Sequence, residues 1–322
     1  VLERAEGLRE SMVQRVWGQL KSVGLSGTSV IATSKAQVEM IQSQLENEVT
    51  LIVEPERRDT FPAIALASTY LYSVKGLNLS EVISVLPVDP FVDDDFFEKV
   101  KELEETLLIS KADLALMGVT PTFPSEKYGY IVPQTERQNE YEFLHVDHFR
   151  EKPTQADAQK LIASGALWNC GVFAFKLEKI INIIKEKGFP VEYKQLIERY
   201  SELPKISFDY EVVEKSSSIV VSQYHGSWKD LGTWNTLTEE MATNMIGYGV
   251  ISDECKNVHV VNELDIPLAV LGISDAVIAA SPDGILISDK NASPRVKEIA
   301  NFNLRPMYEE RLWGWTKVLD FT

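Results

Sequence analysis

Acidic side chains stand just beyond the ends of two apolar stretches of this sequence. Asp89 follows the run 82–86, and Asp230 follows the run 219–224. If both runs are strands of an open α/β sheet, their carboxyl ends border one crevice, where such sheets bind ligands. Two carboxylates there suit Mg²⁺, which takes one or two protein carboxylates and completes its shell with water and phosphate oxygens. A turn residue at position 89 and a helix cap at position 230 are the structural alternatives.

A second group of polar residues has the chemistry to bind a sugar phosphate. Glu151 and Lys152 close the run 142–150, so a carboxylate that can accept sugar hydroxyls stands beside a cation suited to a phosphate. Asn169 can both donate and accept hydrogen bonds. Asp209 stands where a helix is predicted to begin. There are structural alternatives for each residue. The Glu-Lys pair could belong to a solvated loop, Trp168 beside Asn169 could be a core residue, and Asp209 could cap a helix.

Two more segments could shape or read a ligand. Gly129 lies between two tyrosines of a predicted strand, where either a close ligand approach or a β-bulge would explain it. The segment EPERRDTFPA joins a strand to a helix, and Arg58 and Thr60 could support an anion at the helix N-terminus. A glutamate facing a base could accept N1–H and N2–H of guanine, which makes Glu54 or Glu56 a candidate for base choice. Capping and surface charge are the alternatives for this segment.

The surrounding elements must position these residues. Apolar runs and helical patterns alternate through the first three-quarters of the chain. Continuous apolar runs are typical of parallel strands covered by helices on both faces. The pattern predicts a doubly wound α/β domain with a mostly parallel sheet. The expected strands are 28–33, 49–53, 82–86 and 113–119, and the expected helices are 11–20, 36–45, 62–74 and 93–108.

The pattern changes near residue 246. Short β-rich runs with intervening turns follow, at 259–261, 268–271, 276–280 and 285–288. We therefore predict a domain over residues 1–245 and a small β-rich C-terminal domain over 246–322, which ends in a helix near 293–301 and an aromatic tail. Two domains agree with 322 residues at roughly 150 residues each.

Composition narrows the class of partner. Lys and Arg total 32 against 48 Asp and Glu, a net charge of −16, which argues against nucleic acid or an anionic membrane as the main partner. Nucleotides remain compatible, because a few cations can meet their phosphates locally. Two cysteines rule out a disulfide framework and a Cys-rich zinc site, so a reducing, cytoplasmic setting is expected. No apolar run reaches the ~18 residues of a membrane span.

The order of these segments carries more information than any one of them. The chain resembles the mannose-1-phosphate guanylyltransferases, the GDP-mannose pyrophosphorylases of the sugar nucleotidyltransferase superfamily. The similar segments run from residue 54 to residue 237 and are EPERRDTFPAIALA, SVLPVDPFV, GVTPTFPSEKYGYI, FREKP, ALWNCGVFAFK, ISFDYEVVEKS and WKDLGTWNTL.

The resemblance implies a Rossmann-like, cytoplasmic enzyme that binds GTP and mannose 1-phosphate, uses Mg²⁺, and forms GDP-mannose and pyrophosphate. A homodimer is compatible with it. Carried over by position, the resemblance implies that Asp89 and Asp230 are metal ligands and catalytic residues, and that Lys152 is a catalytic residue near the phosphates. It implies that Glu151, Asn169 and Asp209 surround the mannosyl group and that Gly129 shapes that pocket. On the nucleotide side it implies Glu54, Arg58, Thr60 and Pro87.

The chain also departs from the family pattern. The family often has Arg-Asn-Thr-Ala-Pro where this chain has Arg-Asp-Thr-Phe-Pro at 58–62. The family opens with a strand and a Gly-rich phosphate loop, which this sequence does not contain, and the first residue is Val rather than Met. We expect such a segment to precede the chain as a mobile loop. The tail RLWGWTKVLDFT resembles the segment that leads into an isomerase domain in bifunctional relatives, but that domain is absent, so isomerase activity is not expected.

Two rival functions remain open at this level. One is a guanylyltransferase for another sugar 1-phosphate, such as a manno-heptose. The other is a catalytically silent regulatory homologue that binds a sugar nucleotide. The presence of Asp89, Asp230 and Lys152 favours an enzyme, whereas the absent Gly-rich loop favours the silent homologue.

Overall fold

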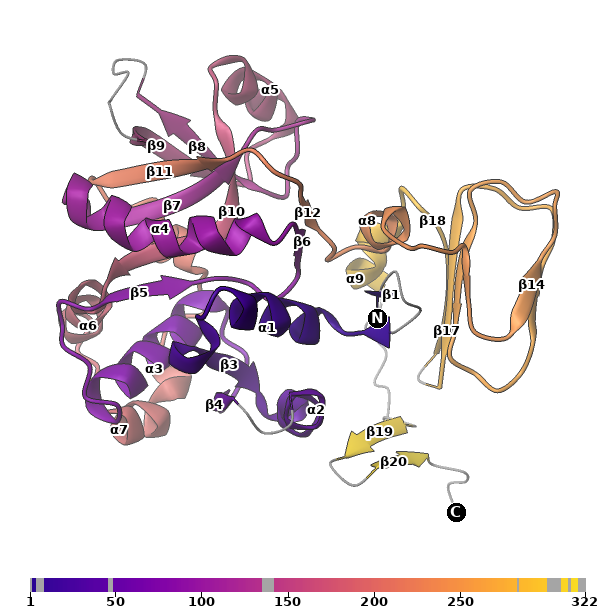
Figure 1. The fold of residues 1–322 in the computed structure, drawn as a ribbon, viewed down its shortest axis with the longest axis horizontal. Helices are drawn as coiled ribbons and strands as arrows, with labels where there is room; N and C mark the ends of the chain where they lie inside the picture. The colour runs from indigo at the N-terminus through magenta and orange to yellow at the C-terminus, as the bar shows by residue number, and fades with distance from the viewer. Residues whose placement is uncertain are drawn as a thin grey trace.

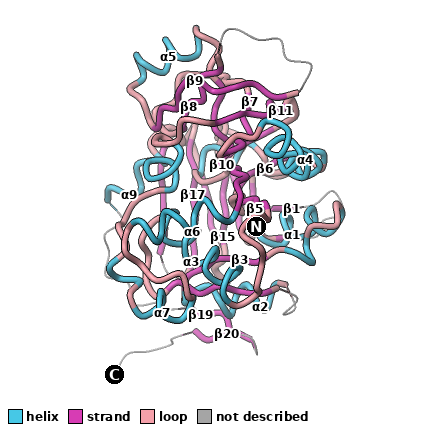
Figure 2. The backbone as a smooth tube through the Cα atoms, turned by 90° about the vertical axis from the view of Figure 1, so that its left-hand side faces the viewer, coloured by secondary structure: helices cyan, strands magenta, loops and turns pink. Residues whose placement is uncertain are grey.

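The computed structural model describes residues 2–3, 9–45, 49–134, 142–282, 284–299, 308–311 and 314–317. Helices pack around a central sheet, and a smaller β-rich part lies to one side of it (Figure 1). The predicted α/β class is therefore confirmed. The view in Figure 2 places α5 (Gln155–Ala163), β8 (Gly129–Pro133) and β9 (Phe143–Glu151) at one end of the molecule. It places α2 (Val38–Gln44), β19 (Tyr308–Arg311) and β20 (Gly314–Lys317) at the other end.

The predicted elements are present with small shifts at their ends. Helix α1 starts one residue later than expected because Ser11 and Gln14 form a reciprocal capping box. Helix α1 spans Met12–Ser22, and the other helices are α2 (Val38–Gln44), α3 (Thr60–Ser73), α4 (Asp95–Ser110), α6 (Leu177–Glu186), α7 (Tyr193–Glu198), α8 (Trp234–Glu239) and α9 (Val296–Ile299). Short 3₁₀ turns lie at η1 (Ser26–Thr28), η2 (Lys35–Gln37), η3 (Tyr200–Glu202) and η5 (Ser293–Arg295). One π-helical turn, η4, spans Asp209–Val213.

Six strands form the central sheet in the order β5-β10-β7-β11-β9-β8. Strand β11 runs parallel to β7, while β9 and β10 run antiparallel to their neighbours, so β5, β7, β8 and β11 share one direction. The common direction that we expected thus holds for four of these strands, with β9 and β10 running against them. The strands are β5 (Val82–Val85), β7 (Leu114–Val119), β8 (Gly129–Pro133), β9 (Phe143–Glu151), β10 (Leu167–Lys176) and β11 (Ile219–Tyr224).

Helices cover both faces of this sheet. On β7, Leu114 and Leu116 belong to a cluster that includes α3 and α6, whereas Ala115 and Met117 belong to a cluster with α4. Every residue of β7 is buried. This two-sided burial explains why the strand is a continuous apolar run rather than an alternating one.

Two pairs of strands lie beside the central sheet. Strands β3 (Val30–Ser34) and β4 (Thr50–Glu54) pair in parallel with each other. Strands β6 (Pro90–Val92) and β12 (Trp228–Asp230) pair antiparallel and form a short ribbon, hereafter the β6–β12 ribbon. Figure 1 shows this ribbon between the central sheet and α8, on the way to the C-terminal part.

The C-terminal part is rich in β-structure, as expected. Strands β13, β15 and β17 run parallel, and β18 joins them antiparallel. The expected helix at 293–301 appears as η5 followed by α9, and residues 300–301 lie outside the described residues. The domain boundary at residue 245 stays a prediction. The strands here are β13 (Met245–Ile246), β14 (Gly249–Ile251), β15 (His259–Asn262), β16 (Leu268–Val270), β17 (Ala276–Ser281) and β18 (Gly284–Asp289).

The two ends of the chain carry short hairpins. Near the start, β1 (Leu2–Glu3) pairs with β2 (Arg9–Glu10). In the aromatic tail, β19 (Tyr308–Arg311) pairs with β20 (Gly314–Lys317), and the rest of the tail lies outside the described residues. Within the part of the chain that the structure describes, no helix is long and apolar enough to cross a membrane.

Candidate functional site

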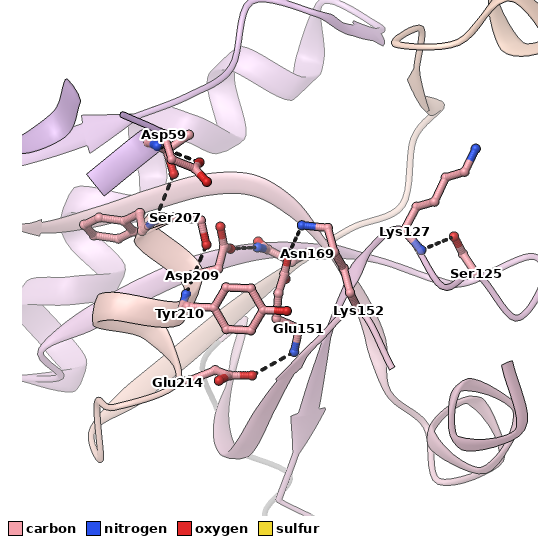
Figure 3. A network of polar contacts seen from close by, with 12 residues as sticks. Asp59, Ser125, Lys127, Glu151, Lys152, Asn169, Ser207, Asp209, Tyr210 and Glu214 are labelled. Carbon is pink, nitrogen blue, oxygen red and sulfur yellow. Dashed lines mark hydrogen bonds and ion pairs between the residues drawn. The ribbon is translucent and has the colours of Figure 1, made fainter. Parts of the chain in front are cut away.

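Four of the predicted sugar-side and phosphate-side residues meet in one polar cluster (Figure 3). Asn169 donates from Nδ2 to Oδ1 of Asp209 at 2.9 Å, and Lys152 donates from Nζ to Oε1 of Glu151 at 2.6 Å. Glu151 and Asn169 are both buried, each with 8% of its surface exposed, whereas the Lys152 side chain is half exposed. Lys152 also has a left-handed φ of 45°, a strained conformation that is common at functional sites.

The π-helical turn η4 explains how the segment FDYEVVE serves this cluster. The backbone N–H of Glu214 donates to the carbonyl of Asp209 at 2.9 Å, which is an i→i+5 bond. Glu214 also accepts the backbone N–H of Glu151 through Oε1 at 3.0 Å. One widened turn therefore directs Asp209 toward β10 and Glu214 toward the end of β9. We refer to Glu151, Lys152, Asn169, Asp209 and Glu214 as the carboxylate cluster.

Gly129 is required by the close packing at the edge of this cluster. It pairs with Glu151 across β8 and β9. A Cβ atom at position 129 would lie 2.5 Å from Cζ of Phe149 and 2.6 Å from Oε2 of Glu151. The missing side chain thus allows the Glu151 carboxylate to lie over β8, and the close approach of a ligand to Gly129 stays a prediction.

The cluster carries more acids than cations, and its electrostatics reflect this. Burial, followed by the nearby charge of Glu151, raises the pKa of Asp209 from 3.8 to about 7. Burial lowers the pKa of Lys152, but the hydrogen bond to Glu151 and the charge of Asp209 outweigh it and leave that pKa above its ordinary value. A hydroxyl-rich ligand could use these acceptors, and an anionic group could approach the exposed end of Lys152.

The two acids proposed as metal ligands lie at neighbouring backbone positions at one end of the β6–β12 ribbon. Asp230 is paired in register with Pro90, and Asp89 is the residue just before that proline. Asp230 accepts the backbone N–H of Gly232 through Oδ1 at 2.7 Å. Carboxylate oxygens are the donors that Mg²⁺ prefers, so the donor chemistry fits. Among the described residues no group of three His, Cys, Asp or Glu could hold a metal alone, so a cation here would also need phosphate or water oxygens.

Three acids that follow Asp89 on the same segment accept hydrogen bonds from other parts of the fold. Asp93 accepts the backbone N–H of Ser227 at 3.1 Å, and Asp95 accepts the Tyr224 hydroxyl at 2.6 Å. Asp94 accepts Nε2 of Gln19 at 2.9 Å. These contacts tie the start of α4 to α1 and to the strand and loop before β12.

Aromatic rings dock the β6–β12 ribbon onto the central sheet. The Tyr128 ring packs edge-on against Trp168 at 4.9 Å and against Trp228 at 5.5 Å between centroids. Each ring neighbours a candidate residue, since Tyr128 precedes Gly129, Trp168 precedes Asn169 and Trp228 lies two positions before Asp230. The indole N–H groups of both tryptophans are buried without a hydrogen-bond partner, so ring packing rather than hydrogen bonding holds this dock. We call these three rings the aromatic dock.

The four residues predicted on the nucleotide side divide into two pairs. Thr60 accepts the backbone N–H of Phe208 at 2.8 Å, next to Asp209, and a Cβ on Gly171 would lie 3.5 Å from Pro87, which places Pro87 near the Asn169 strand. Glu54 instead accepts the Tyr200 hydroxyl at 2.6 Å. Arg58 donates to the carbonyl of Leu203 at 2.8 Å and pairs with Glu56. Thr60 and Pro87 therefore lie next to the carboxylate cluster, whereas Glu54 and Arg58 contact the segment that contains η3. The nucleotide-binding roles of all four residues stay predictions.

Sequence reasoning did not assign roles to Glu214, Tyr128 or Trp228. The five-residue spacing of Asp209 and Glu214 signals nothing when a regular α-helix is assumed, because those positions diverge around a helix of 3.6 residues per turn. The aromatic rings are adjacent to predicted site residues, but nothing in the sequence indicates that three separated segments converge.

Comparison with known proteins identifies the family. A sequence model of the nucleotidyl transferase family matches residues 6–245. The chain belongs to the nucleotidyl transferase family. This nucleotidyl transferase is 27% identical to a mannose-1-phosphate guanylyltransferase of Escherichia coli over 90% of its own length and 68% of that protein. It is 29% identical to a putative mannose-1-phosphate guanylyltransferase of Vibrio cholerae over 84% of its own length and 63% of that protein.

A solved structure agrees with this assignment. The crystal structure of a Thermus thermophilus protein, named there a mannose-1-phosphate geranyltransferase, matches with a TM-score of 0.73 at 27% identity. The match covers 92% of this nucleotidyl transferase and 89% of that chain. The Rossmann-like expectation is borne out at the level of the fold.

The raised pKa of Asp209 predicts a pH-dependent cost to folding. Between pH 4 and about pH 7 the folded state keeps a proton on Asp209 that the unfolded chain has lost, so this residue's contribution to stability falls as pH rises through that window. Asp209→Asn removes the titration. We measure the free energy of unfolding in urea for Asp209→Asn and for the parent. The stability of the variant relative to the parent should be greater at pH 8 than at pH 5.

Asp253→Asn serves as the control, because it removes one carboxylate from an exposed position of the C-terminal part. That variant should differ from the parent by the same amount at both pH values. An equal difference at both pH values for Asp209→Asn would show that Asp209 is not desolvated in solution.

Proposed function

We propose that this nucleotidyl transferase transfers the guanylyl group of GTP to mannose 1-phosphate, giving GDP-mannose and pyrophosphate. The observation that carries the proposal is the carboxylate cluster, which combines hydroxyl acceptors, an amide and one exposed ammonium group. The names of the Escherichia coli and Vibrio cholerae relatives support the choice of both substrates.

The reaction follows from the charges of the reactants. A phosphate oxygen of mannose 1-phosphate attacks the α-phosphorus of GTP, a new P–O bond forms, and the bond to the bridging oxygen breaks as pyrophosphate leaves. The attacking oxygen is already anionic, so no general base is needed. Catalysis then rests on positioning and charge neutralisation, to which Lys152 contributes a cation that Glu151 orients.

A Mg²⁺ ion is part of this proposal, with Asp89 and Asp230 as its protein ligands. When bound, the ion would neutralise charge on the nucleotide and product phosphates. Asp230 is held for this role by its bond to the Gly232 N–H, and a Cβ at position 232 would lie 2.8 Å from Asp230 Oδ1. The glycine thus permits the tight turn that presents the acid.

The mannosyl group would lie against Glu151, Asn169 and Asp209. Asn169 is fixed on both sides of its amide, because it donates to Asp209 and accepts the Gly171 N–H at 3.1 Å. Gly171 has a left-handed φ of 72° at the irregularity of β10, where a side chain would be strained. These contacts support a pre-formed sugar pocket.

The setting we propose is the cytoplasm, with small phosphorylated substrates rather than nucleic acid or an anionic membrane surface as partners. The net charge of −16 and the two unpaired cysteines, Cys170 and Cys255, support it. A homodimer is compatible with the proposal.

Pyrophosphate release across a matrix of nucleotides and sugar phosphates tests the function. With GTP, ATP and UTP crossed against mannose 1-phosphate, glucose 1-phosphate and a manno-heptose 1-phosphate, we expect the highest kcat/KM for GTP with mannose 1-phosphate. Equal turnover with UTP would contradict the guanylyl assignment. A preference for manno-heptose 1-phosphate would show that the sugar substrate is a heptose rather than mannose. No turnover with any pair would favour the catalytically silent homologue.

Asn169→Ala tests the sugar pocket. Removing the amide leaves a sugar hydroxyl and Asp209 without a partner, at a cost of about 1–3 kcal/mol. The KM for mannose 1-phosphate should rise by roughly 5–150-fold, while the KM for GTP changes little. Asn262→Ala is the matched control, since Asn262 is a buried, backbone-bonded amide in the C-terminal part. An equal effect of Asn169→Ala on both substrates would make Asn169 structural.

Asp89→Asn and Asp230→Asn test the metal pair. Each substitution should abolish turnover with almost no change in melting temperature, because Asn can still accept the Gly232 N–H at position 230. Mn²⁺ binding in the presence of GTP, followed by electron paramagnetic resonance, should weaken in parallel. Asp93→Asn is the control on the same segment, since Asp93 bonds the Ser227 N–H. An active double Asn variant would rule the pair out.

A further inference from the structure

The end of strand β9 is paired on one side only. Strand β8 follows it as far as Glu151, whose partner is Gly129. Strand β11, on the other side of β9, pairs with residues 143–145. Among the described residues, no strand pairs with the β11 side of β9 beyond residue 145. The backbone groups that face that side near Glu151 must therefore find other partners, because an unbonded N–H next to buried side chains is costly.

The side chain of Glu214 supplies the partner that a neighbouring strand would otherwise supply. Its Oε1 accepts the backbone N–H of Glu151 at 3.0 Å (Figure 3). The next backbone N–H, that of Lys152, faces the opposite side and donates to the Tyr128 carbonyl at 3.3 Å. Two hydrogen bonds, one on each side, thus hold the end of β9 between η4 and the start of β8.

The backbone of Lys152 is strained and depends on such support. Its φ of 45° lies in the left-handed region, which a residue with a Cβ adopts at a cost. A strained residue keeps its conformation where the surrounding contacts fix it. Lys152 is also the cation of the carboxylate cluster, with its side chain half exposed and its ammonium group bonded to Glu151. The direction of that ammonium group therefore depends on how the backbone is held.

We propose that Glu214 is a positioning residue for the proposed transfer reaction. By holding the backbone at Glu151 and Lys152, it keeps the Lys152 ammonium group directed at the phosphate of the sugar 1-phosphate. The inference rests on the proposed function, in which Lys152 neutralises charge during the transfer. Glu214 acts through its hydrogen bond rather than through its charge, so an uncharged acceptor of the same length can replace it.

The π-helical turn η4 gives Glu214 its place and keeps that place without the Glu214 carboxylate. The backbone N–H of Glu214 donates to the Asp209 carbonyl at 2.9 Å. Glu211, in the same turn, is buried and pairs with Lys187 at 2.6 Å and with Lys215 at 2.9 Å. Lys187 caps the end of α6, so η4 is anchored to that helix independently of β9. Removal of the Glu214 carboxylate should therefore release the end of β9 and leave the turn folded.

Amide hydrogen exchange, followed by NMR, tests the contact without any substrate. In Glu214→Ala the N–H of Glu151 loses its acceptor, so its exchange should become about tenfold faster or more. In Glu214→Gln the amide oxygen can still accept, and the exchange rate should stay close to that of the parent. Glu192→Ala is the matched control, because Glu192 also accepts a backbone N–H, that of Gln195 at 2.9 Å at the start of α7. It should leave exchange at Glu151 unchanged.

Kinetics test the consequence for the reaction, with the substrate pair that turns over fastest in the matrix of nucleotides and sugar phosphates. Glu214→Ala should lower kcat by about 10–100-fold, because the cation is displaced from the charge that it must neutralise. The KM for the nucleotide should change little. Glu214→Gln should recover most of the parent kcat, and Glu192→Ala should retain it. Equal losses in Glu214→Gln and Glu214→Ala would overturn the proposal.

A double-mutant cycle tests whether Glu214 acts through Lys152. Lys152→Gln removes the cation, so Glu214→Ala should lower kcat little further in that background. Independent, multiplicative losses would overturn the proposal. An active parent with an equally active Glu214→Ala variant would overturn this role alone, whereas a parent without turnover on any substrate pair would overturn the proposed function and this role with it.

Discussion

Packing between three aromatic rings connects the segment that carries the two candidate metal ligands to the central sheet. The β6–β12 ribbon shares no strand pairing with the central sheet among the described residues, so side-chain contacts hold it there. Arg15 and Gln19 of α1 donate to the Val92 carbonyl of the ribbon. The rings of Tyr128, Trp168 and Trp228, each from a different strand or strand end, pack against one another. Aromatic pairs contribute about 0.5–1.5 kcal/mol beyond their burial. The dock therefore couples the acids of the ribbon to the carboxylate cluster on β9 and β10.

Burying two acids close together makes the carboxylate cluster electrostatically unfavourable. Glu151 and Asp209 are acids held close together and away from water, and the raised pKa of Asp209 is the direct result. The fold offsets this cost with donors from Asn169 and Lys152, whereas Glu214, which the widened turn brings to the backbone of Glu151, adds a third carboxylate. Such an arrangement favours a ligand rich in hydroxyl groups, because each hydroxyl supplies a further donor to a cluster of three carboxylates and two donor side chains.

An apolar cavity between β3 and β5 lies next to the segment that leads into the β6–β12 ribbon. The segment after β5 lines the end of the cavity with Leu86 and Val88 and continues directly to Asp89. Packing inside the cavity therefore bears on the position of the acid through a few residues of backbone. An α/β sheet concentrates such coupling at the carboxyl edge, because every loop that leaves a parallel strand meets the others there.

The sequence by itself determined the fold class, most elements and the identity of four of the five residues that meet in the cluster, with Glu214 as the exception. Periodicity sufficed for the strand at 113–119 because both of its faces are buried, and ordered motifs sufficed for Glu151, Asn169 and Asp209. Only the tertiary structure decided which of the charged residues engage the cluster and which, like Glu54 with Tyr200, bond elsewhere. It alone revealed the π-helical turn, the aromatic dock and the open cavity. The cluster and the aromatic dock depend on contacts between segments 40 to 100 residues apart in the chain, and local patterns of polarity contain no information about which distant segment a side chain will meet.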